Sequence, residues 1–248
     1  MHGNLDLSAA CMKGYGMIIT VVGAGGKTTI CLCLGKELSR RGGRVLFTTT
    51  TQIYRPDCCP VFVGDPEDLS PSGRFTAAGS QEIQNGKLKG FTAEETDAIE
   101  RRRSFDYILV EGDGAKGRPV KAPAEWEPVY PGLTRLAVGV IGLDCLGKPV
   151  SEENVHRSEL FMQITGAHPG EVIKKEHLQK LIVHPLGLFR HAPQAAEKVV
   201  LCNKTDRIGN NTDIEEYRRK SGYPVFAAGR DRDWADEFIG KFILPARG

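Results

Sequence analysis

Residues 17–29 read Met17-Ile-Ile-Thr-Val-Val-Gly23-Ala-Gly-Gly26-Lys27-Thr28-Thr29, an apolar run that leads directly into a glycine loop. Five of the six residues from Met17 to Val22 are apolar, which is typical of a strand buried on both faces. The glycines allow the backbone to turn sharply and to direct successive N–H groups into a concavity. The stretch therefore predicts a strand, a phosphate-binding loop and a helix, in that order.

The polar residues of this loop predict a nucleotide site. Lys27 supplies a positive charge that can reach the β- and γ-phosphates, and the Thr28 hydroxyl can ligate Mg²⁺. Because Thr28 opens the next helix, the positive end of the helix dipole faces the same point. The alternative is a glycine turn in an ordinary βα unit with an incidental lysine. We expect Mg²⁺ with ATP or GTP as cofactors, contacted by Gly23, Ala24, Gly25, Gly26, Lys27, Thr28 and Thr29.

The loop is shorter than the common phosphate-binding pattern. Only two residues separate Gly23 from Gly26, whereas the usual loop has four residues between its glycines. The spacing resembles the short Gly-x-x-Gly-Lys-Thr loop of the Mur ligases and of folylpolyglutamate synthetase. That resemblance permits an ATP-dependent kinase or ligase that acts on an acidic metabolite.

Composition indicates a globular protein without a large charge bias. The 248 residues include 33 basic and 31 acidic side chains, for a net charge of +2, far from the basic surplus of a dedicated nucleic-acid binder. No apolar run is long enough to cross a bilayer, and the N-terminus lacks the pattern of an export signal. With an odd number of cysteines, seven in all, we expect reduced thiols in a cytoplasmic protein that binds neither nucleic acid nor membranes. The adjacent Cys58 and Cys59 are ordinary loop thiols or a reactive or metal-binding pair.

Strand-like and helix-like segments alternate along the chain, which predicts a mainly parallel sheet covered on both faces. We expect a single α/β domain, 1–248, with a three-layer P-loop nucleotide-binding fold and a small β insertion at about 65–91, where Asn85-Gly86 is a hairpin-type turn. The expected strands are 17–22, 44–48, 61–63, 106–110, 136–141, 198–202 and 223–227, and the expected helices are 28–40, 92–103, 154–165, 174–183, 212–219 and 234–242.

Charged residues follow the strand expected at 106–110. In an open parallel sheet, ligands bind beyond the carboxyl ends of the strands. Glu111 and Asp113 stand where a P-loop enzyme keeps the acid that holds Mg²⁺ or its water, although acids also end strands for no catalytic reason. Together with Thr28 they are the candidate metal ligands. Three cations come next, Lys116, Arg118 and Lys121, and they form either an anion clamp with a catalytic role or a solvated basic loop.

Asn203-Lys204-Thr205-Asp206 follows a late strand and matches the Asn-Lys-x-Asp motif with which G proteins read guanine. The Asp206 carboxylate can accept hydrogen bonds from N1–H and N2–H₂ of guanine, a pair that adenine does not present. Asn203 would support the loop, and the stem of Lys204 would cover the base plane. These residues are therefore candidate base contacts. His156-Arg157 falls at an expected helix start and is interpreted as structural or exposed rather than catalytic.

Several of these blocks together resemble one known family, the YqeC family, over about residues 14–206. The blocks are Val22–Thr29, Val110-Glu-Gly-Asp-Gly-Ala-Lys116, Val120-Lys-Ala-Pro-Ala-Glu125 with Glu127-Pro128, Gly142-Leu-Asp-Cys-Leu-Gly147, Val155-His-Arg157 and Cys202–Asp206. Members are described as accessory proteins of selenium-dependent molybdenum hydroxylases. The resemblance implies a cytoplasmic nucleotide-binding protein whose partners are the molybdenum cofactor, a selenium donor or a molybdenum hydroxylase.

Three functions are consistent with these observations. The first is a Mg²⁺-dependent, nucleoside-triphosphate-using maturation enzyme, with Lys27, Glu111 and Asp113 in catalytic roles. The second is a GTP-gated chaperone without small-molecule chemistry, and the third is the kinase or ligase named above. Fold class alone does not choose among them.

Overall fold

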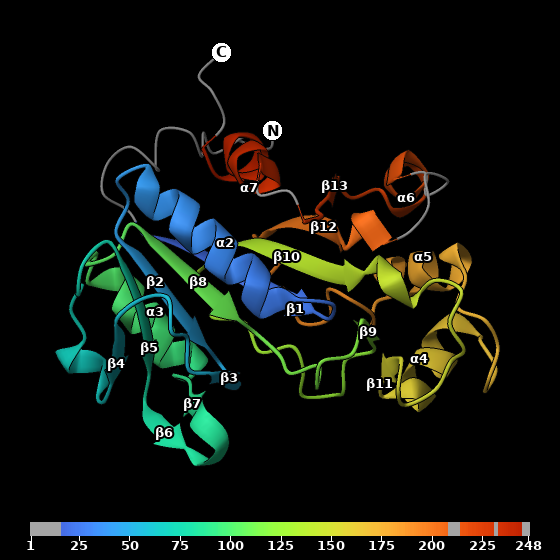
Figure 1. Ribbon diagram of the computed structural model, residues 1–248, viewed down its shortest axis with the longest axis horizontal. Coiled ribbons are helices and arrows are strands. Elements are labelled where there is room, and N and C mark those ends of the chain that lie inside the picture. Colours follow the sequence, from blue (N-terminus) through green and yellow to red (C-terminus); the bar gives the residue numbers. More distant parts are fainter. Residues whose placement is uncertain (1–15, 208–213, 231–232, 245–248) are drawn as a thin grey trace.

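The computed structural model describes residues 16–207, 214–230 and 233–244. Its centre is an eight-stranded sheet with the order β13-β12-β10-β1-β8-β2-β5-β4 (Figure 1). Every neighbouring pair in this sheet is parallel, so the predicted α/β class is confirmed. The strands are β1 (Met17–Gly23), β2 (Val45–Thr49), β4 (Val61–Val63), β5 (Phe75–Gly79), β8 (Tyr107–Glu111), β10 (Thr134–Gly142), β12 (Glu197–Asn203) and β13 (Val225–Ala227).

Helices cover both faces of the sheet, as predicted for three layers. Alternate residues of β1 show this, because Ile19 and Val21 pack with α2 (Lys27–Arg40) and α7 (Asp233–Phe238). Val22 packs on the opposite face with α4 (Ser158–Thr165), α5 (Lys175–Val183) and α6 (Ile214–Ser221). Ile18 packs on that second face with α3 (Ala93–Arg101). The strands are thus buried on both sides, which explains their continuous apolar runs.

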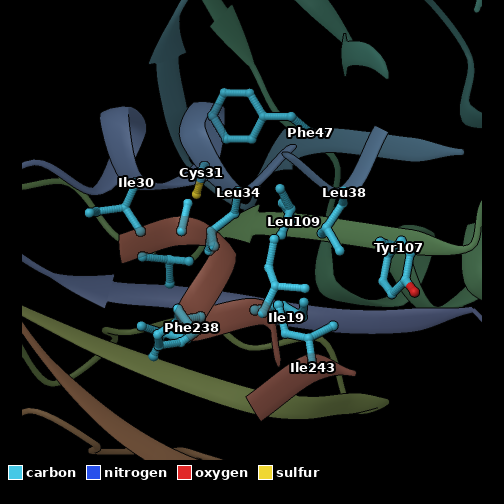
Figure 2. Packing of buried hydrophobic residues seen from close by; sticks show 14 of the residues in the cluster. Ile19, Ile30, Cys31, Leu34, Leu38, Phe47, Tyr107, Leu109, Phe238 and Ile243 are labelled. Carbon is cyan, nitrogen blue, oxygen red and sulfur yellow. The ribbon is translucent and has the colours of Figure 1, made fainter. Parts of the chain in front are cut away.

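Helix α2 is anchored through one apolar stripe. Ile30, Leu34 and Leu38 recur at intervals of four residues and point from the helix toward β1 and β8, where they meet Ile19 and Leu109 (Figure 2). Each fully buried side chain of this kind stabilises the fold by about 1.5–3 kcal/mol. Because α2 begins at Lys27, this packing also fixes the position of the glycine loop.

Helix α3 begins as its sequence predicts. The Thr92 hydroxyl accepts a hydrogen bond from the Glu95 N–H, and the Glu95 carboxylate accepts one from the Thr92 N–H, which is a capping box. The helix ends at Arg101, two residues before the predicted end.

The small sheets differ from the sequence expectation. β6 (Gln81–Ile83) and β7 (Lys87–Lys89) form the predicted antiparallel hairpin around the Gln84–Gly86 turn, and β7 also pairs with β3 (Gln52–Tyr54). The stretch 65–91, predicted as an insertion, is therefore divided. Its strand β5 lies in the main sheet between β2 and β4, where all five of its residues are buried. The Pro66–Asp68 turn precedes this strand.

One helix prediction was wrong at its start, whereas another was correct in extent but not in helix type. The helix expected at 154–165 begins only at Ser158, because Val155–His156 forms β11 and pairs with β9 (Val120–Lys121). The helix expected at 234–242 is α-helical from Asp233 to Phe238 and continues as a π-helical segment, Ile239–Ile243. Residues 212–213 of the helix expected at 212–219 lie outside the described residues.

The register of the central strands brings the candidate residues to one edge of the sheet. Val21 of β1 pairs with Glu111 of β8, and Gly142 of β10 pairs with Asn203 of β12. The carboxyl ends of these four strands therefore meet, and ligands of parallel sheets bind at such an edge. The short turns Leu143–Cys145 and Thr205–Arg207 follow β10 and β12 directly.

Candidate functional site

The glycine loop turns tightly against the end of β10. Gly23 has φ +90°, and a Cβ there would lie 2.4 Å from the Val140 carbonyl oxygen. Gly25 approaches Gly142 so closely that a Cβ would lie 2.2 Å from the Gly142 nitrogen. Both positions therefore require glycine. At both positions the added Cβ would meet backbone atoms, which cannot move aside as a side chain can.

The N–H groups of the loop fall into two sets. The first three donate within the protein: Gly23 to Asp113 Oδ2 (3.1 Å), Ala24 to the Val140 oxygen (2.9 Å) and Gly25 to the Arg118 oxygen (3.1 Å). The first helical bond of α2 runs from Ile30 to Gly26, so the N–H groups of residues 26–29 precede it at the positive end of the helix. The N–H groups of residues 26–29 are therefore the ones that could hold a phosphate. The N–H groups of Gly23, Ala24 and Gly25 instead fix the shape of the loop.

Lys27 lies buried between two carboxylates. Its Nζ donates to the Gly23 oxygen (2.8 Å) and lies 3.3 Å from Asp113 Oδ1 and 3.5 Å from Glu111 Oε1. Burial alone would lower the pKa of Lys27, but the charges of Asp113 and Glu111 outweigh burial and raise the pKa. Lys27 is consequently held as a cation at the foot of the loop.

Thr28 and Glu111 form the pair that best fits a magnesium ion. The Thr28 hydroxyl donates to Glu111 Oε2 at 2.7 Å, and hydroxyl and carboxylate oxygens are ligands that Mg²⁺ accepts. Burial raises the pKa of Glu111, against the opposing charge of Lys27. The Thr49 hydroxyl donates to the Glu111 carbonyl oxygen at 2.7 Å and fixes the backbone at this point. Thr29 lies exposed on the first turn of α2.

Asp113 connects Lys27 to a series of ion pairs that leads away from the loop. Besides Lys27, Asp113 contacts Lys121 (Oδ2 to Nζ, 2.9 Å), and Lys121 contacts Glu127 (Nζ to Oε2, 2.7 Å). Arg157 donates from Nη1 to the same Glu127 oxygen at 2.5 Å. Burial raises the pKa of Glu127, but hydrogen bonds from Lys121 and Arg157 outweigh it and lower that pKa. We call these residues the buried ion chain, Lys27–Asp113–Lys121–Glu127–Arg157.

The three cations predicted as a clamp are separated by the structure. Lys121 is 2% exposed and is committed to the buried ion chain and to the Gly114 oxygen (2.7 Å). Lys116 is exposed and Arg118 half-buried on the loop after β8. Arg118 donates from Nε to the Glu152 oxygen at 2.6 Å. Only Lys116 and Arg118 thus face an open surface, where they line a pocket with Arg157.

The residues of the Asn-Lys-x-Asp motif lie beside the glycine loop. Asn203 Nδ2 donates to the Gly25 oxygen at 2.8 Å. Lys204 donates to Asp144 Oδ2 at 2.9 Å, and Asp206 lies exposed in the following turn, 3.8 Å from the Arg230 guanidinium. Asn203 therefore supports the loop, and Asp206 is placed where a ligand can reach it.

Sequence reasoning did not place four nearby residues in the site. Glu127 and Arg157 belong to the buried ion chain, and Asp144 holds Lys204. The buried Tyr130 hydroxyl has no hydrogen-bond partner within the described residues, and burial with the charge of Asp113 raises the pKa of Tyr130. Glu127 and Arg157 could have been found from the sequence, because they belong to the Lys-Ala-Pro and His-Arg blocks of the family pattern. The sequence alone did not show which opposite charges these two residues contact.

Other sequence expectations concern thiols, metals and membranes. The six described cysteines are free thiols; Cys11 lies outside the described residues. Burial raises the pKa of Cys59 to about 11, with a further contribution from Cys58. Within residues 16–207, 214–230 and 233–244, no three His, Cys, Asp or Glu side chains gather as a metal-binding group. In the same residues every helix is too short or too polar to span a bilayer.

Fold and site together define an α/β protein with a glycine loop, a buried lysine and paired carboxylates at the carboxyl edge of a parallel sheet. The family model described as YqeC protein matches residues 19–159. A relative from Escherichia coli (strain K12), described as "Uncharacterized protein YqeC", is 40% identical over 200 residues, which covers 78% of each chain. The chain therefore belongs to the YqeC family.

Proposed function

We propose that this chain is a Mg²⁺-dependent, nucleoside-triphosphate-binding maturation protein. The observation that carries the proposal is the convergence of Lys27, Thr28 and Glu111 at the start of α2. A lysine ammonium, a helix N-terminus and a hydroxyl–carboxylate pair 2.7 Å apart are the groups that phosphates and a magnesium ion require.

Each of these residues has a distinct part in the proposal. Lys27 and the N–H groups of residues 26–29 bind the phosphates. Thr28 and Glu111 hold Mg²⁺, which neutralises charge on the phosphates when it is bound. Asp113 already contacts Lys27, Lys121 and the Gly23 N–H, so it positions the lysine and the loop, and Glu111 takes the metal.

The maturation role rests on the family resemblance. Because YqeC proteins are described as accessory proteins of selenium-dependent molybdenum hydroxylases, we propose the molybdenum cofactor, a selenium donor or such a hydroxylase as partner, in the cytoplasm. Chemically, the site suits an NTP hydrolase or an NTP-dependent transferase, because its groups bind and neutralise phosphate charge.

A second candidate function is a GTP-gated chaperone. The hydrogen bond from Asn203 to the Gly25 oxygen favours it, because it joins the guanine-reading motif to the phosphate loop. A nucleotide in the loop would then place its base near Asp206. Base preference separates this candidate from an ATP-dependent enzyme.

The proposal is tested by calorimetric titration of Mg·ATP and Mg·GTP into the parent protein and Lys27→Met, which keeps most of the buried stem. We expect at least about 100-fold weaker binding in the variant, because a charge-assisted contact to phosphate is lost. The exposed Lys36 lies on the same helix, so Lys36→Met is the matched control. Equal affinity in Lys27→Met and the parent would end the proposal. Mass spectrometry of products formed from nucleotide, selenide and molybdopterin identifies the reaction.

A further inference from the structure

A pocket of about 820 Å³ is lined in part by the loop that follows β8. This loop contributes Lys116 and Arg118, and the next segment contributes Trp126. His156 of β11 and the adjacent Arg157 also line the pocket. The pocket is therefore built from segments that flank β9 and β11 in the sequence.

The pocket presents a flat aromatic surface beside a fixed cation. Trp126 is 71% exposed, and the Arg157 guanidinium lies 5.9 Å from the centre of its ring. The Arg157 guanidinium is held in place by its hydrogen bond to Glu127 at 2.5 Å. An exposed indole next to a fixed guanidinium is a stacking surface for a planar ring.

Charges in the pocket limit the ligand further. Lys116, Arg118 and Arg157 are positive, and the exposed Glu125 and Glu159 add negative charge to the wall. A third acid, Glu152, is already occupied, since it accepts hydrogen bonds from the Ser158 N–H and hydroxyl. The mixture of signs disfavours a polyanion such as a nucleic-acid strand and suits a ligand with one acidic group.

We propose that this pocket binds a planar aromatic compound that carries a single anionic group, with its ring stacked on Trp126 and its anion held by Lys116 and Arg118. Within the proposed function, on which this step rests, that compound is the second substrate. The binding site itself rests only on the pocket.

Two connections join the pocket to the phosphate loop. The Arg118 carbonyl oxygen accepts the Gly25 N–H at 3.1 Å. In addition, the buried ion chain runs from Lys27 to Arg157 with successive separations of 3.3, 2.9, 2.7 and 2.5 Å. One end of this chain, Lys27, thus lies at the proposed phosphate site, and the other end, Arg157, lines the pocket. This arrangement is expected when two substrates bind on either side of the same loop.

The test uses 1-anilinonaphthalene-8-sulfonate, an aromatic anion, and N-phenyl-1-naphthylamine, the same ring system without the sulfonate. Dye fluorescence is titrated with the parent protein, Trp126→Ala and Lys116→Ala. The matched control is Tyr54→Ala, since Tyr54 is 66% exposed with Lys87 at 5.0 Å over its ring but lines no part of this pocket.

We expect Trp126→Ala to weaken sulfonate binding at least about fivefold, the lower end of a stacking contact. Lys116→Ala should weaken the sulfonate but leave the neutral dye unchanged, and Tyr54→Ala should change neither affinity. Equal sulfonate affinity in the parent and Trp126→Ala, or an equal loss in Tyr54→Ala, would overturn the proposal. Calorimetry of Mg·ATP and Mg·GTP on the same samples separates the two proposals: absence of nucleotide binding removes the proposed function and leaves the pocket result standing.

Discussion

Replacement of Asp113 by asparagine tests the buried ion chain most directly. Asp113 is fully buried, and its two oxygens serve Lys27 at 3.3 Å, Lys121 at 2.9 Å and the Gly23 N–H at 3.1 Å. The amide has nearly the same shape but no charge. Asp113→Asn therefore leaves two buried ammonium groups with one anion fewer, and one of its oxygens becomes an N–H₂ donor that faces other donors.

The cost follows from this geometry. Loss of one partner of a buried ion pair destabilises a protein by about 3–5 kcal/mol. For a domain of this size each kcal/mol lowers the melting temperature by about 2–4 °C, so we expect a decrease of about 6–20 °C. Because Lys27 then lacks one anion, an added polyphosphate should stabilise the variant at least as much as it stabilises the parent.

Thermal unfolding followed by circular dichroism, with and without pyrophosphate, measures both effects. Glu82→Gln is the control, since it makes the same carboxylate-to-amide change in an exposed pair, Arg55–Glu82 at 3.1 Å, and should cost less than about 1 kcal/mol. A melting temperature of Asp113→Asn within the range of this control would refute the reasoning, because the chain would then contribute no more than a surface ion pair.

Two further predictions concern the metal and the base. Glu111→Gln should keep nucleotide binding but lower turnover by at least about two orders of magnitude, because the metal loses its anionic partner. Single-turnover assays check this prediction. If Asp113→Asn shows the loss and Glu111→Gln does not, the roles of the two carboxylates are exchanged. If Asp206 reads guanine, GTP should bind more tightly than ATP by roughly 2–4 kcal/mol, or about 30- to 1000-fold, and Asp206→Asn should favour xanthosine triphosphate. Competitive titration showing ATP bound at least as tightly as GTP excludes the guanine reading, and the GTP-gated chaperone with it.

The central strands were predictable from local sequence. Five of the six residues from Met17 to Val22 and all four residues before Glu111 in β8 are apolar, because both faces of β1 and β8 are covered. A glycine loop between such a strand and a helix also has few conformations open to it. Local pattern and global fold agree here, so these predictions needed no knowledge of distant contacts.

The segments that were mispredicted depend on distant partners. Val155 and His156 have the composition of a helix start, and they form a strand only because β9 lies alongside. Similarly, the role of Lys121 is decided by Glu127 and by Asp113, which the chain brings to within 3 Å of its ammonium. Sequence spacing shows three cations in one loop, but burial separates Lys121 from Lys116 and Arg118.

The balance of charges in the buried ion chain explains why these ion pairs suit a binding site, although their burial costs desolvation free energy. Lys27, Lys121 and Arg157 are matched by three carboxylates, Glu111, Asp113 and Glu127, so the cluster is neutral as it stands. Buried ion pairs contribute little net stability compared with apolar packing, which leaves their positioning of Lys27 as their main effect. A triphosphate would add negative charge at Lys27 and weaken its hold on Asp113. Asp113 would then attract Lys121 more strongly, and this would weaken the contact of Lys121 with Glu127 and change the contact of Glu127 with Arg157 at the pocket. If an anion binds at the glycine loop, we therefore expect its charge to act through these contacts as far as Arg157, whose guanidinium lies 5.9 Å from the centre of the Trp126 ring.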